Sequence, residues 1–300
     1  MGTRQRYDGK LLRDLPAFRK INPFVMRGRN ESAIYYTQIV DIQETHEFLK
    51  QHNRGKERDD RLSLFHVILS SAVRVLAQRP QLNRFVSGQR IYQRNRIQLS
   101  FIVKKDLTDD GEETNAKITF SPYDTLETAR KRINKHVGDA RRKEGNASDQ
   151  EIGFVTRLPR IIINMIVEGW RFLDHYGIAP KKMIELDPLY TSVYFANLGS
   201  VGLDAPFHHL YEWGNASIFA VIGRPKRQLL PVGNGHFEPR LAIEMKYTID
   251  DRISEGVYAA KALSLFRDYI QHPENLAEPP ELSQETIDEL SLVDMGKPVE

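Results

Sequence analysis

Two consecutive segments towards the end of the chain change from the periodicity of a strand to that of a helix. From Leu241 to Ile249 apolar and more polar residues alternate, which is the pattern of a strand with one buried face. From Ser254 to Gln271 apolar residues recur at helical spacing, with Ser254 as the expected N-cap and Pro273 beyond the end. A chain that carries both periods side by side is expected to fold as an α/β protein.

The same two signals recur along the rest of the chain. Further helices are expected over 62–78 and 126–143, and Trp170 and Phe172 are expected in the core of another amphipathic helix. Further strands are expected over 34–40, 97–103, 193–197 and 218–222. These elements follow no regular βαβ period, which favours a mixed α/β sandwich over a doubly wound sheet. The glycine-rich fingerprints of the common nucleotide-binding folds do not occur in the sequence.

Composition excludes several classes of function. The absence of cysteine removes disulfides, zinc-thiolate sites and cysteine nucleophiles. The 43 basic and 40 acidic residues are interspersed, so neither nucleic acid nor a membrane surface is expected as a partner. The most apolar run, Ile161 to Val167, is far shorter than the ~20 residues of a membrane span, and the first residues lack a signal-peptide pattern. The chain is therefore predicted to be cytoplasmic.

One domain is expected over residues 1–278, followed by an acidic tail over 279–300. Because the tail contains Glu281, Glu285, Asp288 and Glu289, it is interpreted as a short surface helix or as an arm that packs on a neighbouring subunit.

Three segments, taken in order, resemble a known family. They are PQLNRFVSGQRIYQRNRIQLSFIVKK (80–105), YFANLGSVGLDAPFHHLYEWGNASIFAVIG (194–223) and FEPRLAIEMKYTIDDRISEGVYAAKALSLFRDYIQHPENL (237–276). Together they look like the catalytic core domain of the dihydrolipoyl acyltransferases of 2-oxo acid dehydrogenase complexes, in the chloramphenicol acetyltransferase-like superfamily. The resemblance covers most of the chain, from about residue 6 to residue 276.

The resemblance implies a two-layer mixed-sheet sandwich of the chloramphenicol acetyltransferase-like type. It also implies a homotrimer or larger homo-oligomer, with each active site in a channel between two subunits. Coenzyme A is the implied cofactor, with acyl coenzyme A as substrate, and other components of 2-oxo acid dehydrogenases are the implied partners. The sequence contains no lipoyl domain and no Ala/Pro-rich linker, so the chain is not expected to be a complete acyltransferase subunit by itself.

The family's two reactive positions are occupied differently here. In the family motif D-H-R-x-x-D-G a histidine takes the proton of the nucleophile, and a serine before an N-L-G segment donates to the oxyanion. Aligned to these motifs, Asp251 stands at the histidine position and Ala196 at the serine position. The surrounding motif and channel positions are Asn197, Gly199, Arg252, Glu255 and Gly256. A carboxylate with an ordinary pKa near ~4 is a weaker base than imidazole for a thiol.

A neighbouring loop offers a replacement base. His208 and His209 follow the N-L-G segment at 197–199. Asp251 or Glu255 could orient one of these histidines as the acid member of a dyad. The alternative is that both histidines only pack a turn or a subunit contact. No metal is predicted, since these residues lack a recognised ligand spacing.

Basic residues elsewhere leave a choice of roles. They are Arg84, Arg90, Arg94 and Arg96, with a basic run from Arg130 to Lys143. They could receive the phosphates of coenzyme A, or they could form solvated surfaces.

Two hypotheses for the function follow. The first is a coenzyme A-dependent acyltransferase-like enzyme with a relocated base. The second is a catalytically inactive relative that keeps the core for assembly, ligand binding or regulation. The sequence identifies neither the acyl group nor its acceptor.

Overall fold

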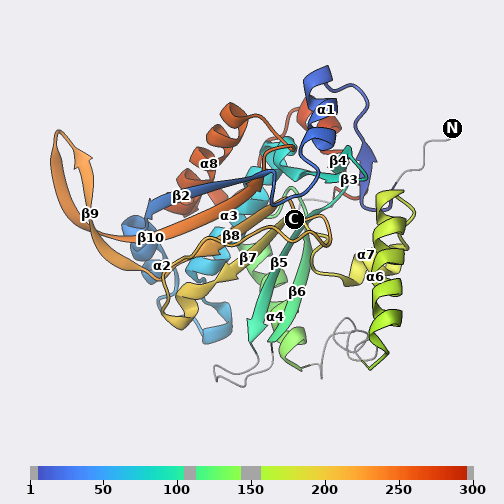
Figure 1. Ribbon diagram of the computed structural model, residues 1–300. Helices are drawn as coiled ribbons and strands as arrows, with labels where there is room; N and C mark the ends of the chain where they lie inside the picture. The colour runs from blue at the N-terminus through green and yellow to red at the C-terminus, as the bar shows by residue number, and fades with distance from the viewer. Residues whose placement is uncertain (1–5, 105–112, 143–156, 296–300) are drawn as a thin grey trace.

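The computed structural model describes residues 6–104, 113–142 and 157–295, and its centre is a seven-stranded sheet (Figure 1). The strands lie in the order β2-β10-β8-β7-β5-β6. The seventh strand, β9, pairs with the first half of β10, from His236 to Ala242. Their bounds are β2 Ala33–Asp41, β5 Ile97–Lys104, β6 Glu113–Phe120, β7 Val193–Asn197, β8 Ile218–Ile222, β9 Lys226–Gly233 and β10 His236–Asp250. The pairs β5–β7 and β7–β8 are parallel and the others antiparallel, so the predicted mixed sheet is confirmed.

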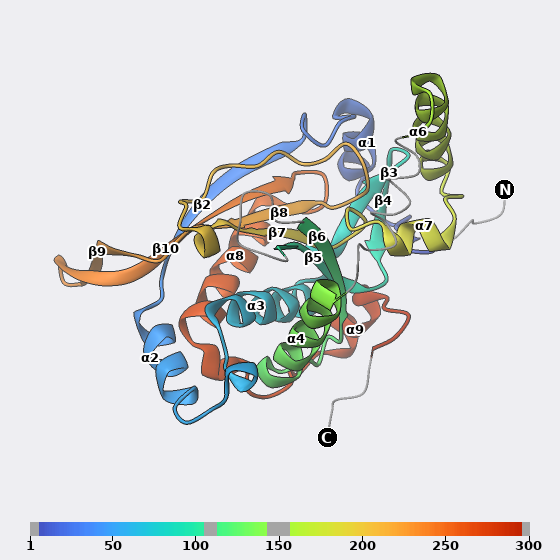
Figure 2. The ribbon, with the colours of Figure 1, turned by 90° about the horizontal axis from the view of Figure 1, so that it is seen from below.

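Helices cover one face of this sheet. Figure 2 shows α3, α4 and α8 together on one side of the strands. The main helices are α1 Ala17–Val25, α2 Gln43–His52, α3 Leu64–Gln78, α4 Leu126–Arg142 and α8 Gly256–Gln271. Between sheet and helices lies the main core, in which Leu69, Ile97 and Ile243 are fully buried. The mixed α/β sandwich predicted from the periodicities is confirmed, and so is the two-layer arrangement implied by the family resemblance.

The helix starts differ in how they are capped. At α3, the Ser63 hydroxyl accepts from the His66 backbone N–H at 3.2 Å, and the Ser63 N–H donates to His66 Nδ1 at 3.1 Å. At α8 the N-cap is Glu255, with no side-chain cap bond, so the prediction that Ser254 caps this helix is wrong. Ser254 is buried beside the tight turn in which the Ile253 N–H donates to the Asp250 carbonyl, and the helix begins only after it.

A loop covers the other face of the sheet. Residues 202–217 connect a short 3-10 helix, Leu198–Val201, to β8. In this loop Ala205 and Leu210 are buried against Tyr194, Phe219 and Val221 of the sheet, which forms a second, smaller core. The histidine pair singled out in the sequence lies in this loop.

A second small sheet and two further helices stand at one end of the domain. The sheet has the order β1-β4-β3, with β1 Gly9–Leu11, β3 Arg84–Ser87 and β4 Arg90–Arg94. Beside it lie α6 Arg160–His175 and α7 Lys181–Leu186 (Figure 1). Trp170 is buried as expected, but Phe172 is 59 % exposed, so its assignment to the core is wrong. Only one edge of α6 reaches the domain, and Phe172 points away from it.

The acidic tail lies against its own chain. It contains the helix α9 Gln284–Leu290, in which Leu290 is fully buried. Glu289 forms an ion pair with Arg84 at 2.8 Å, and the Ser121 hydroxyl donates to the Met295 carbonyl at 2.7 Å. The described part of the tail is therefore fixed to β3 and to the loop that follows β6. The remaining 3-10 turns are Arg58–Asp60, Pro80–Asn83 and Pro273–Leu276.

Candidate functional site

The end of β10 is held by a buried ion pair. The Arg252 guanidinium donates to both carboxylate oxygens of Asp250, at 2.8 and 2.7 Å, and both side chains are almost completely buried. The second Nη of Arg252 donates to the carbonyl oxygens of Met26 and Arg27. This ion pair fixes the chain on both sides of Asp251.

Asp251 and Glu255 lie beside a hollow next to α1. The hollow has a volume of about 350 Å³ and is also lined by Arg19, Asn22 and Gly256. Asp251 is half-buried, and its backbone carbonyl accepts from Arg19 at 3.2 Å. The Glu255 side chain is 72 % exposed and lies 3.9 Å from the same guanidinium. Both carboxylates are therefore accessible, and Arg19 partly balances their charge.

The segment with Ala196 lies at the end of β7. Ala196 is half-buried and packs against the smaller core, while Asn197 ends the strand. Gly199 packs against the backbone of Gly223, where an added Cβ would approach the Gly223 carbonyl oxygen to 2.6 Å. A side chain at position 199 would therefore displace the turn that follows Ala196.

The histidine loop is ordered by ring stacking and by backbone hydrogen bonds. The His208 ring lies parallel to Phe219, with 3.9 Å between the ring centroids, and its Nδ1 is 2.7 Å from the His209 carbonyl oxygen. A carbonyl oxygen only accepts hydrogen bonds, so His208 Nδ1 carries the proton and Nε2 presents a lone pair. His209 Nδ1 is bound in the same way to the Leu210 carbonyl oxygen, at 2.9 Å.

The structure does not bring the predicted histidines and carboxylates into contact within one chain. The Thr248 hydroxyl donates to the His208 carbonyl oxygen, which places the histidine loop beside β10 three residues before Asp251. Among the described residues, neither histidine ring is hydrogen-bonded to Asp251 or Glu255. Within one chain the carboxylates face α1, and the histidines lie on the helix-free face of the sheet.

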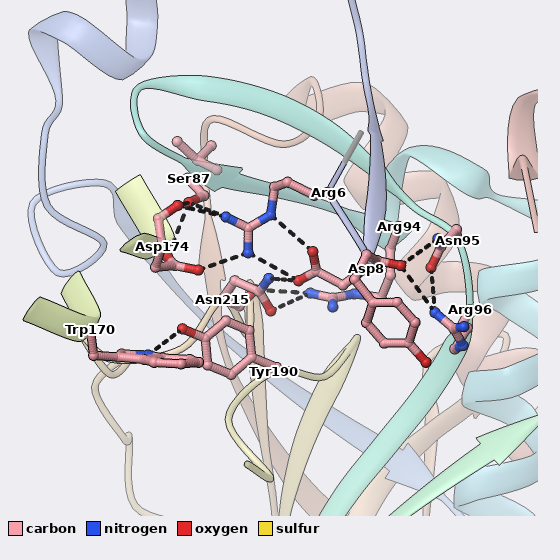
Figure 3. A network of polar contacts seen from close by, with 12 residues as sticks. Arg6, Asp8, Ser87, Arg94, Asn95, Arg96, Trp170, Asp174, Tyr190 and Asn215 are labelled. Atoms are coloured by element: carbon pink, nitrogen blue, oxygen red, sulfur yellow. Dashed lines mark hydrogen bonds and ion pairs between the residues drawn. The ribbon is translucent and has the colours of Figure 1, made fainter. Parts of the chain in front are cut away.

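A polar site that the sequence does not reveal lies between the small sheet and α6 (Figure 3). Arg6 donates to Asp8 at 2.9 Å and to Asp174 of α6 at 2.8 Å, and Asn215 donates to Asp8 at 2.6 Å. Arg94 donates to the Asn215 side chain at 2.8 Å. Although burial alone would raise it, the neighbouring Arg6 holds the pKa of Asp8 below its usual value. This network ties together residues that are up to 207 positions apart.

The basic residues named in the sequence are mostly bound within the domain. Arg94 is 1 % exposed, and Arg84 pairs with Glu289. Arg96 lies over the Tyr7 ring, and Arg130 donates to Glu127 at 2.6 Å. Of the basic run from Arg130, Lys143 lies outside the described residues.

Two other kinds of site are absent from the described residues. In 6–104, 113–142 and 157–295 no group of three or more carboxylate or imidazole side chains is arranged to hold a metal ion. No helix in these ranges is both long and apolar enough to cross a membrane.

Comparison with known proteins agrees with this geometry. The family model described as 2-oxoacid dehydrogenases acyltransferase (catalytic domain) matches residues 25–152. The dihydrolipoamide acetyltransferase of Azotobacter vinelandii is similar in structure, with 16% identity over 88% of this chain and 93% of that chain and a TM-score of 0.58. This chain has the fold of the 2-oxoacid dehydrogenase acyltransferase catalytic domain.

Two further structures have the same fold. The cubic core of a pyruvate dehydrogenase multienzyme complex is 14% identical over 88% of this chain and 93% of that chain, with a TM-score of 0.53. A chloramphenicol acetyltransferase is 14% identical over 88% of this chain and 98% of that chain, with a TM-score of 0.52. The predicted family resemblance and fold class are thereby confirmed. A search of curated proteins gave no match to the sequence.

Proposed function

We propose that this chain is a coenzyme A-dependent acyltransferase-like protein in which His208 serves as the base. The observation that carries the proposal is the position of the His208 ring, which is held flat on Phe219 with Nδ1 bound to a carbonyl oxygen. With Nδ1 bound in this way, Nε2 presents a lone pair that can accept a proton.

The proposed step is an acyl transfer. His208 Nε2 takes the proton from the thiol or hydroxyl of the acceptor as its sulfur or oxygen attacks the thioester carbonyl of acyl coenzyme A. The carbon–sulfur bond to coenzyme A then breaks, and the departing thiolate takes the proton back from His208. The products are the acylated acceptor and coenzyme A, and no oxidant or reductant is needed.

The known positions of the family support a relocated base. In the Azotobacter vinelandii enzyme a serine, a histidine and an asparagine have been studied for their roles in catalysis, and the last two stand four residues apart. Asp251 and Glu255 have the same spacing in this chain. Neither carboxylate is an efficient base for a thiol. The backbone carbonyl oxygen of His208 accepts from the Thr248 hydroxyl, so the histidine loop lies beside the end of β10 that leads to Asp251.

A second candidate is a catalytically inactive relative with an assembly, ligand-binding or regulatory role. Ala196 favours it, because a methyl group offers no hydrogen bond to an oxyanion and stands at the family's serine position.

We also propose that copies of this chain assemble as a homotrimer or a larger homo-oligomer. Support comes from apolar side chains that are exposed in the single chain, among them Phe18 and Val25 of α1, Ile39 of β2 and Met165 of α6. Exposed apolar area of this extent is typical of association surfaces. We further propose other components of 2-oxo acid dehydrogenases as partners of this assembly.

The first experiment is a calorimetric titration of the purified protein with coenzyme A and acetyl coenzyme A, with the molecular mass measured in the same buffer. Micromolar binding to a trimer or larger assembly is expected. A well-folded oligomer that binds neither compound would refute the acyltransferase proposal.

The base is tested by histidine variants. His208→Ala is expected to lower acyl transfer by about 10²- to 10⁴-fold, as for the loss of a general base. His209→Ala is the matched control and is expected to stay near the unmodified rate. If both variants keep full activity, the relocated base is excluded. If activity arises only in a variant that combines Asp251→His with Ala196→Ser, the inactive-relative candidate is supported.

A further inference from the structure

A cavity of about 310 Å³ lies beside the polar network, between residues 27–29, the β3–β4 turn, α6 and residues 212–214. Its volume is at the lower end of the range typical of small-molecule sites. Trp170 and Trp213 both line it, and they are the two tryptophans of the sequence. Their rings are stacked with 6.2 Å between the ring centroids, and together they give the cavity an aromatic wall.

Arg29 lines the cavity and has unused hydrogen-bonding capacity. Its side chain is 8 % exposed, and its two Nη atoms donate to the carbonyl oxygens of Tyr211 and Val86, at 3.3 and 3.1 Å. Its Nε is buried without a hydrogen-bond partner, and within the described residues Arg29 forms no ion pair. Burial lowers the pKa of Arg29, because the charged form loses water without gaining a direct counter-ion.

The acidic groups of the lining are already bound to other donors. Asp174 accepts from Arg6 at 2.8 Å and from the Ser87 hydroxyl at 3.0 Å. Glu212 accepts from the backbone N–H groups of Arg29 and Asn30, at 3.1 and 2.9 Å. Although burial alone would raise it, these hydrogen bonds hold the pKa of Glu212 below its ordinary value.

The other arginines of the lining differ in whether a carboxylate balances their charge. Arg252 is paired with Asp250, and Arg171 donates to Glu168 at 2.8 Å. Arg27 is exposed, and the described residues provide it with no ion pair. The positive charge that still lacks a counter-ion therefore belongs to Arg27 at the rim and Arg29 inside.

We propose that this cavity binds a small organic oxyanion, a carboxylate or a phosphate ester, whose charged group is held by Arg29 and Arg27. The flat or apolar part of the molecule lies against the tryptophan wall. Guanidinium groups suit both anions, because their N–H donors match the oxygen spacing of carboxylates and phosphates. The proposed base His208 does not line this cavity, and Asp251 and Glu255 line a different hollow, so the anion site is distinct from the proposed acyl-transfer site.

The test uses tryptophan fluorescence of the full chain, because both tryptophans line the cavity. The protein is titrated with benzoate as a planar carboxylate and, separately, with inorganic phosphate, and calorimetry checks the stoichiometry. We expect a saturable change with at least one probe at one site per chain. A response to benzoate alone identifies a carboxylate site, and a response to phosphate alone identifies a phosphate site.

Two variants decide whether the arginines bind the probe. Arg27→Gln is expected to weaken binding about tenfold, which corresponds to one charged hydrogen bond of ~1.4 kcal/mol. Arg29→Lys keeps the charge but loses Nε–H, and a similar or larger loss is expected. Arg224→Gln is the matched control, because Arg224 is an exposed arginine that pairs with Asp204 away from the cavity.

Several results would overturn the proposal. They are the absence of a saturable response to both probes, or equal affinity in the unmodified protein and Arg27→Gln. Should Arg29→Lys fail to fold by circular dichroism, the exposed Arg27 decides alone. Binding of benzoate or phosphate without binding of coenzyme A would support the anion site and refute the acyltransferase proposal. Binding of coenzyme A without binding of either probe would refute the anion site and leave the acyltransferase proposal standing.

Discussion

The helices α3 and α6 are nearly equal in length, with 15 and 16 residues, and both are rich in isoleucine, leucine and valine. Twelve residues of α3 are buried, from His66 to Ala77, but in α6 only Trp170 is. α3 lies between the sheet, α4 and α8, whereas α6 touches the domain along one edge (Figure 2). Apolar residues at helical spacing therefore predict a helix with an apolar face. The elements packed around the helix decide whether that face is covered.

The forces that hold the two helices differ as well. α3 is fixed by apolar side chains from several elements. α6 is fixed by Asp174 and Trp170, through hydrogen bonds to Arg6 and Tyr190. The stability of the first depends on packing, and the attachment of the second depends on a buried charge network.

The largest effect is expected from Arg6→Leu. This change leaves Asp8 and Asp174 without their guanidinium partner, and removing one member of a buried pair typically costs about 3–5 kcal/mol. Urea unfolding should show this loss, and amide hydrogen exchange in α6 should accelerate more than in α3. Arg13→Leu, at an exposed arginine, is the control. A loss below about 1 kcal/mol would mean that the network does not hold α6.

A pair of truncations compares the two helices directly. Leu69→Ala in α3 removes a fully buried side chain and is expected to lower the free energy of unfolding by about 2–5 kcal/mol. Met165→Ala in α6 changes a side chain that is 70 % exposed and is expected to stay within about 0.5 kcal/mol. Both are measured by urea unfolding at a protein concentration where the oligomeric state is known. Equal losses would show that the α6 face is buried in solution by another copy of the chain.

A pH-dependent effect is expected at Lys117, which joins β6 to α7. Its ammonium group donates to the carbonyl oxygens of Ile184 and Asp187, at 2.7 and 3.0 Å, and burial lowers its pKa to about 7. The unfolded chain keeps this proton up to about pH 10.4, so it binds more protons than the folded chain between the two values. Stability should therefore rise with pH from about 7 to 10, by up to about 1.4 kcal/mol per pH unit.

Lys117→Met should remove this part of the pH dependence. The free energy of unfolding is measured by urea titration at several pH values, for the variant and the unmodified protein. An unchanged slope between pH 7 and 10 would contradict the assignment to Lys117.

Local periodicity was sufficient for most of the sheet and its covering helices. The strands 193–197 and 218–222 were predicted with the observed bounds, because short buried strands read as continuous apolar runs between turn residues. The N-cap of α8 was misplaced by one residue, because the tight turn after Asp250 buries Ser254. Phe172 was misassigned because its helical spacing does not reveal that α6 has one covered edge.

The sites were less accessible to sequence reasoning. Motif alignment located Ala196 and Asp251, but the hydrogen bond that fixes the His208 tautomer depends on the fold of one loop. The cavity with Arg29 joins residues from six separate segments, and none of them carries a local pattern. Two tryptophans that share one wall could have been suspected only if α6 had first been placed beside residues 212–214.

The pairing of β2 with β10 joins strands about two hundred residues apart, with Ala33 opposite Asp250 and Asp41 opposite Ala242. While the chain is being synthesised, β2 therefore has no sheet neighbour until residue 250 has left the ribosome. Such long-range pairing makes folding slow and leaves an apolar strand edge open to other nascent chains in the meantime. Because β10 is the strand that pairs with β2, its synthesis is expected to be the step after which this edge of the sheet is protected.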